Sequence, residues 1–117
     1  MKVDFFWDGE GCGREPNCRS DVLSNDGVDF IVCLFTDHGG RKYQDSISWI
    51  DEGLSRVKAV KIGAIDGSDW SRDSWGVELK RGAAKVYSLY DEDYFAIIGV
   101  DEFERALIGW RDFLLSG

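Results

Sequence analysis

The sequence is poor in the residues that catalytic sites need. It has 117 residues but only one histidine, His38, which precedes Gly39 and Gly40 without the spacing of a catalytic triad. Its glycine-rich segments, 9–13 and 37–40, have neither the frame of a P-loop nor the fingerprint of a dinucleotide-binding fold. We therefore expect a protein that is not an enzyme and that uses no cofactor.

Long apolar runs and targeting signals are also missing. The chain has no run of eighteen apolar residues, no basic and apolar leader and no lipidation motif. These absences predict a cytoplasmic protein that makes no membrane contact. A hydrophobic fraction of 44% suffices for the core of one globular domain over residues 1–117.

Cysteine is limited to Cys12, Cys18 and Cys33, an odd number that fits a reducing compartment. With His38 they could form a zinc site with three sulfur ligands and one nitrogen ligand. Their spacing fits none of the usual zinc knuckles. Cys33 also lies in an apolar run, where a small buried side chain is the commoner role, so we assign no metal site.

Acidic residues outnumber basic ones. The 22 Asp and Glu against 14 Lys and Arg give a formal net charge of −8. Proteins that bind the phosphate backbone carry basic surfaces, so this surplus argues against direct nucleic-acid binding and favours a cationic partner. The alternative is that the acids merely keep a small domain soluble.

The second half of the chain has the clearest pattern. Residues 75–80 alternate apolar with small or charged side chains, as in a strand with one solvated face. Arg81-Gly82 predicts a tight turn into a strand over 84–90. The acids 91–93 predict a second turn, and the apolar run 94–98 predicts a third strand.

A C-terminal amphipathic helix is expected after this third strand. Asp101 and Glu104 have the spacing of a capping box. Gly109 predicts a point of close approach between the helix and the sheet. The apolar stripe, wide enough for packing on a sheet, consists of Phe103, Ala106, Leu107, Trp110, Phe113 and Leu114.

The first strand candidate is the aromatic segment 3–7, followed by a loop through about Asn17. The apolar run 28–35 predicts a buried strand. A turn at 25–27 would let this strand form a hairpin with residues 21–23.

The middle of the chain predicts a short helix over 46–54, capped by Asp45 or Ser46, then a strand over 57–65 and a polar loop over 66–74. Short turns allow hairpins and forbid crossovers. We therefore predict an α+β domain with a mainly antiparallel sheet, one short middle helix and a C-terminal helix packed on the sheet.

Acidic side chains gather around the predicted loop 66–74 and the second turn. Aromatic anchors ringed by acids suit a basic partner, because rings supply contact area and charge speeds encounter. Trp70 is the better anchor, since Trp75 shares the strand parity of two core positions. The candidate partner-binding residues are Asp66, Asp69, Trp70, Asp73, Glu78, Asp91, Glu92 and Asp93.

The same acids have other interpretations. Each one alone is most commonly a solvated turn residue. As metal ligands or as general acid and base, the cluster 66–73 would instead make a small metal-dependent enzyme or metal-binding domain, although it lacks the spacing of an EF-hand. An exposed edge at 3–7 could support a scaffold that self-associates; otherwise we expect a monomer or weak homodimer.

The order of motifs in the second half resembles small immunity proteins of bacterial polymorphic-toxin and contact-dependent growth inhibition systems. The resemblance implies an acidic, non-enzymatic protein that binds a cognate basic toxin domain, commonly a nuclease, in the cytosol. It carries over no binding motif residue by residue. The matching segments are Ser68-Asp69-Trp70, Ser74-Trp75-Gly76-Val77-Glu78-Leu79, Val86-Tyr87-Ser88-Leu89-Tyr90, and Phe103, Leu107, Trp110 and Phe113.

Overall fold

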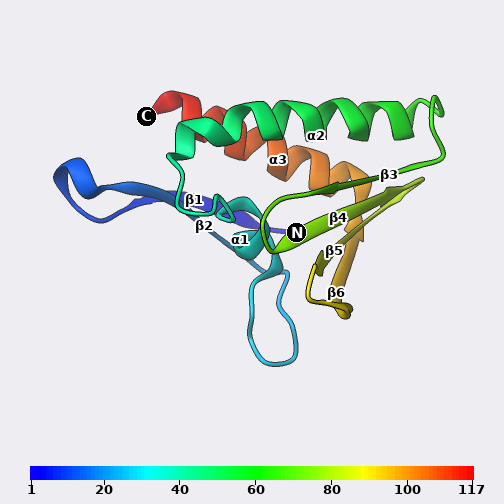
Figure 1. Cartoon of the computed structure of the whole chain (residues 1–117), viewed down its shortest axis with the longest axis horizontal. Helices are drawn as coiled ribbons and strands as arrows, with labels where there is room; N and C mark the ends of the chain where they lie inside the picture. The colour runs from blue at the N-terminus through cyan, green and yellow to red at the C-terminus, as the bar shows by residue number, and fades with distance from the viewer.

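Two antiparallel sheets and three α-helices form the fold of this chain (Figure 1). The computed structural model describes the backbone of residues 1–117 and every side chain except that of Cys12. The elements in chain order are β1 (Val3–Asp8), η1 (Gly11–Gly13), β2 (Glu15–Ser20), α1 (Phe30–Phe35), η2 (Tyr43–Asp45), α2 (Ser46–Lys61), β3 (Gly67–Ser71), β4 (Trp75–Lys80), β5 (Ala83–Ser88), β6 (Asp91–Gly99) and α3 (Val100–Ser116).

The larger sheet is a meander in the order β3-β4-β5-β6, with every neighbouring pair antiparallel. The helices cover one face of it: α2 contacts β3 and β4, α3 contacts β5 and β6, and α1 contacts β4 and β5. This confirms the predicted α+β class and the antiparallel sheet. The hairpin of β1 and β2 forms a separate two-stranded sheet that extends beyond the helices (Figure 1).

The meander strands follow the alternation of their side chains. In β4 and β5, Val77, Leu79, Ala84 and Val86 are fully buried toward the helices, while the intervening residues point to the other face. This confirms the strands predicted at 75–80 and 84–90. The tight turn at 81–82 is also present.

The C-terminal helix packs as its stripe predicts, with Phe103, Leu107 and Trp110 almost completely buried. The predicted capping box is wrong. Gly99 occupies the N-cap position without a side-chain cap. Asp101 and Glu104 instead pair with Lys61 of α2, at 2.7 and 2.8 Å, and so link the two long helices.

Close approach at Gly109 is confirmed, although the neighbour is β1 rather than the meander. A Cβ added at Gly109 would lie 2.9 Å from Cε2 of Phe5. The Phe5 ring stacks against Phe113 with centroids 5.7 Å apart and packs against Trp110 at the same distance. These rings attach the small sheet to α3.

The strand predicted at 28–35 is wrong, because residues 30–35 form the helix α1. Asp29 caps this helix: its carboxylate accepts hydrogen bonds from the N–H groups of Ile31 at 3.1 Å and Val32 at 3.2 Å. A short apolar run does not distinguish a buried strand from a buried helix. The hairpin predicted before it is reduced to a single bridge between Leu23 and Asp29 around the turn at 25–27.

The strand predicted at 57–65 is also wrong, because the middle helix does not stop at 54 but continues to Lys61. Ile50, Gly53, Val57 and Val60 are buried at intervals of three and four residues, the spacing of one helical face. The β-branched side chains of Val57 and Val60 favour strands intrinsically, but packing against the sheet and α3 decides the outcome.

The loop predicted to run through Asn17 contains a strand from Glu15, which pairs with β1 over its whole length. The strand predicted at 3–7 is confirmed as β1. Pairing places Cys18 opposite Phe5, and the Cys18 side chain is 3% exposed. Cys18 and Cys33 are both free thiols.

We expect the Cys18 thiol to resist modification until the protein unfolds. Burial, followed by the charges of Asp29 and Cys33, raises the Cys18 pKa to about 12, so almost no thiolate exists near pH 8. In a Cys12→Ser background, Ellman's reagent should label Cys18 at least about a hundredfold more slowly in buffer than in denaturant. Equal rates in both conditions would contradict its burial. Cys33 is the other thiol that would react in this background, so the additional substitution Cys33→Ser serves as the control that leaves only the signal of Cys18.

Candidate functional site

Trp70 is a core residue, so the prediction that it is a loop-borne surface anchor is wrong. The segment predicted as a polar loop contains strand β3, and Trp70 points from it toward α2 with 4% of its surface exposed. Its ring stacks on Trp49 at 3.8 Å between centroids and meets Phe103 edge-on at 6.3 Å. A partner therefore has no direct access to Trp70.

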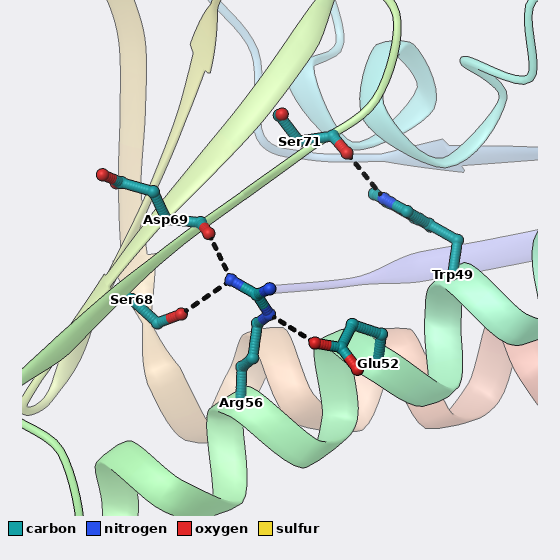
Figure 2. A network of polar contacts seen from close by, with 6 residues as sticks. All are labelled: Trp49, Glu52, Arg56, Ser68, Asp69 and Ser71. Atoms are coloured by element: carbon teal, nitrogen blue, oxygen red, sulfur yellow. Dashed lines mark hydrogen bonds and ion pairs between the residues drawn. The ribbon is translucent and has the colours of Figure 1, made fainter.

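The outer edge of β3 is closed by side chains of α2 (Figure 2). Arg56 Nη1 donates to the carbonyl of Asp69 at 2.5 Å, and Trp49 Nε1 donates to the carbonyl of Ser71 at 2.9 Å. Glu52 holds the Arg56 guanidinium at 2.9 Å from one helical turn away. Carbonyls that another strand would otherwise use are occupied, so this edge is protected from strand addition.

The face of the meander turned away from the helices carries the candidate site. We call it the open face. Its side chains come from all four strands, and the register places them in adjacent rows. Figure 2 shows the Asp69 carboxylate pointing away from Arg56, although the backbone of the same residue binds it. The open face comprises Asp69, Glu78, Lys85, Tyr87, Phe95 and Ile97.

Two carboxylates of the open face lie directly opposite each other. The Arg72 N–H donates to the Trp75 carbonyl at 2.9 Å, and this bond fixes the phase of the β3–β4 ladder. Asp69 and Glu78 consequently face each other as a pair that exchanges no backbone hydrogen bond, the arrangement in which opposite side chains lie closest. Like charges in such a pair destabilise the sheet.

The basic residues nearby neutralise this pair only in part. Lys80 binds Glu78 at 3.0 Å, but the Lys80 side chain is 70% exposed, so the ion pair is weak. Lys85 lies opposite Glu78 in the register, yet its ammonium sits over the rings of Phe95 at 4.6 Å and Tyr87 at 5.6 Å. Asp69 makes no ion pair within the described residues.

The negative potential of these acids acts on Tyr87. Partial burial, together with the charges of Asp69, Glu92 and Glu78, raises the pKa of its phenol. The three acids belong to β3, β6 and β4, so the potential extends across the width of the sheet. A cation bound on this face would lie in the combined negative potential of these acids.

Apolar side chains lie beside the acids. Phe95 is 42% and Ile97 62% exposed, an unusual degree for large residues in the interior of a strand. They line a shallow groove of about 270 Å³ together with Glu78, Lys80 and Lys85. The open face thus combines contact area with negative charge.

The other acids that the sequence indicates fall in different places. Asp66 precedes β3 and lines a second groove, of about 430 Å³, with Asp69 and Glu78. Asp73 lies in the loop between β3 and β4, where its carboxylate covers Gly39. The turn predicted at 91–93 is wrong: residues 89–90 form the turn, and Asp91 begins β6.

The predicted site is therefore divided. Asp66, Asp69 and Glu78 come together, Asp91, Glu92 and Asp93 lie together at the start of β6, and Asp73 and Trp70 belong to neither group. Among the described side chains, no three from His, Cys, Asp and Glu converge to hold a metal ion. The zinc arrangement involving Cys12 lies outside the described side chains.

Sequence reasoning missed Tyr87, Lys85, Phe95 and Ile97. The run 94–98 is apolar throughout, so its alternation is invisible in the sequence. Only the pairing of Phe95 with Tyr87 and of Ile97 with Lys85 shows which side chains face outward. The charge on Lys85 was the available signal, because it marks the solvated parity of β5.

Comparisons with protein-family models, with curated proteins and with solved structures find no match to this chain. None of its described helices has the length and apolar character needed to cross a bilayer. The chain folds as an acidic α+β domain with one solvated sheet face, the open face.

Proposed function

We propose that this protein is a binding module, an immunity protein that neutralises a cognate basic toxin domain in the bacterial cytosol. The observation that carries the proposal is the pair of opposed carboxylates, Asp69 and Glu78, on the open face, which has only the exposed Lys80 as a counterion among the described residues. A sheet gains nothing in stability from opposed carboxylates. A cation on another molecule would relieve the repulsion within such a pair.

The surroundings of the pair support a protein partner rather than a small ion. Phe95 and Ile97 provide exposed apolar surface next to the acids, as interface cores require. The formal net charge of −8 attracts a basic domain from a distance and speeds its encounter. Nucleases are the leading class of target, because domains that act on RNA or DNA carry basic surfaces.

Co-expression with the protein encoded immediately upstream tests this proposal. We expect the two proteins to co-purify, and we expect the association rate to fall by about tenfold or more from low to high salt, because screening removes the long-range attraction. Stopped-flow or surface-plasmon measurements would report the rate. If no complex forms and the upstream protein is harmless when expressed alone, the proposal fails.

A further inference from the structure

The two edges of the meander differ. Edge β3 has its carbonyls bound by Arg56 and Trp49, whereas β6 is the opposite, outer strand of the sheet. In the part of the chain that the structure describes, the outer backbone groups of β6 at 95 and 97 accept and donate no hydrogen bond. This is an unprotected edge of a nine-residue strand.

The ladder phase shows which groups are free. The Val100 N–H donates to the Gly82 carbonyl at 3.2 Å, so the pair just before it exchanges no backbone hydrogen bond. Hydrogen-bonded and non-hydrogen-bonded pairs alternate along an antiparallel ladder, so the pairs of Ile97 and Phe95 are also non-hydrogen-bonded. The N–H and C=O groups of both residues therefore point away from β5. Two donors and two acceptors are thus available at the spacing that an added strand uses.

A groove lies beside residues 93–96 of β6, between this part of the strand and the loop 23–26. Its volume is about 580 Å³, and Leu23, Phe30 and Phe95 are among the apolar residues that line it. Leu23 is 57% exposed. The hydroxyl of Tyr94 bonds Asp26 at 2.9 Å and thereby ties the loop to the strand.

The charge of the groove identifies its occupant. Asp26 and Asp93 line it, and Asp91 and Glu92 begin the same strand. None of the four makes an ion pair with a described residue. The hydrogen bonds from Ser24 and Tyr94 lower the Asp26 pKa, which keeps this carboxylate charged. An extended segment with basic side chains complements the groove.

A second copy of this chain does not complement the charge of this groove. An antiparallel pair of β6 strands centred on Ala96 would place the acidic residues 91–93 of one copy opposite residues 99–101 of the other, so that Asp91 faces Asp101 at both ends of the pair. Each molecule also carries a formal net charge of −8. Like-charge contacts of this kind oppose association.

We propose that β6 is a docking edge, to which an extended basic segment of the toxin domain adds as a fifth strand of the meander. The inference rests on the proposed function, because the same basic partner supplies the segment. Phe95 connects the two surfaces: its backbone lies on the edge, while its side chain lies on the open face. One partner can therefore engage both.

Proline at position 97 tests the edge directly. Ile97→Pro removes an outward N–H without removing a bond to β5, a position at which sheets tolerate proline. Ile97→Ala removes the same side chain but keeps the N–H and is the matched control. With the upstream-encoded protein as probe, we expect Ile97→Pro to bind about tenfold or more weakly than Ile97→Ala. Equal affinities would overturn the inference.

Amide hydrogen exchange on the wild-type complex gives a readout that does not depend on the folding of a variant. The amides of Phe95 and Ile97 should exchange rapidly in the free protein and slow by about tenfold or more in the complex. The amide of Ser71 on the closed edge should not change. A complex that leaves the β6 amides unprotected would overturn the inference while the proposed function stands.

Two further outcomes would count against β6 as a docking edge. If the free protein is a dimer by light scattering with its β6 amides already protected, a second copy occupies the edge and the inference is wrong. If the wild-type protein forms no complex with the upstream-encoded protein, the proposed function fails and this inference fails with it.

Discussion

Trp70→Ala should lower the free energy of unfolding by about 3–5 kcal/mol, as loss of a large buried aromatic does. The indole is 4% exposed and lies between Trp49, Phe103 and the helix surface at Gly53. Truncation leaves a cavity that this tight packing cannot refill. Urea denaturation followed by circular dichroism measures the change.

Two other variants test the packing of Trp70 against α2. Trp70→Phe should cost less than Trp70→Ala, because it keeps an aromatic ring and deletes an indole N–H that is buried without a described partner. Gly53→Ala should destabilise although alanine favours helices by about 1 kcal/mol, since its Cβ would overlap the Trp70 ring. Ser55→Ala, exposed in the same helix, is the control.

If Trp70 were instead a surface anchor, the pattern would reverse. Trp70→Ala would then leave the denaturation midpoint unchanged and weaken only the binding of the partner. Gly53→Ala would stabilise the protein slightly. Either result would contradict the packing described here.

The antiparallel meander and the C-terminal helix could be predicted from the sequence because their patterns are local. In β4, glycine and charged residues alternate with the apolar Trp75, Val77 and Leu79, and in α3 the apolar stripe recurs every three or four residues. Each of these elements buries one face and exposes the other. The period of its apolar residues therefore indicates directly which side chains are buried.

The elements at 30–35, 57–61 and 67–71 could not be predicted in this way. Residues 30–35 are apolar throughout, and Val57 and Val60 have strand-like side chains that tertiary packing holds in a helix. Strand β3 has glycine, serine and aspartate at most positions, so its local preference is for a loop. Pairing with β4 and the side-chain bonds from α2 make it a strand.

The sequence predicts which residues of the candidate site are acidic, but not how they are arranged. The acids Asp69 and Glu78 were identified by type, but their direct opposition depends on strand register, which one sequence does not contain. Charge marked the acids, whereas nothing in the run 94–98 separates outward from inward residues. The polar residues that flank Trp70 in the sequence predict an exposed side chain, whereas packing against α2 buries it.

Neutralising the open face should make the protein more stable and the complex weaker. Asp69→Asn with Glu78→Gln keeps side-chain size and removes the like-charge pair, which we expect to raise the free energy of unfolding by a few tenths to about 1 kcal/mol. The same change should weaken binding of the upstream-encoded protein about tenfold or more, chiefly through slower association at low salt. Urea denaturation and binding kinetics measure the two effects separately.

A control with the same change in net charge distinguishes local contacts of Asp69 and Glu78 from the long-range attraction of the whole protein. Asp4→Asn with Asp8→Asn alters two exposed acids of β1 and likewise shifts the formal net charge from −8 by two, to −6. Long-range attraction falls equally in both double variants. If the β1 variant weakens binding as much as the open-face variant does, the acids act only through net charge and Asp69 and Glu78 form no site. Opposite signs for stability and affinity, confined to the open face, would show that the sheet tolerates this repulsion because a partner relieves it.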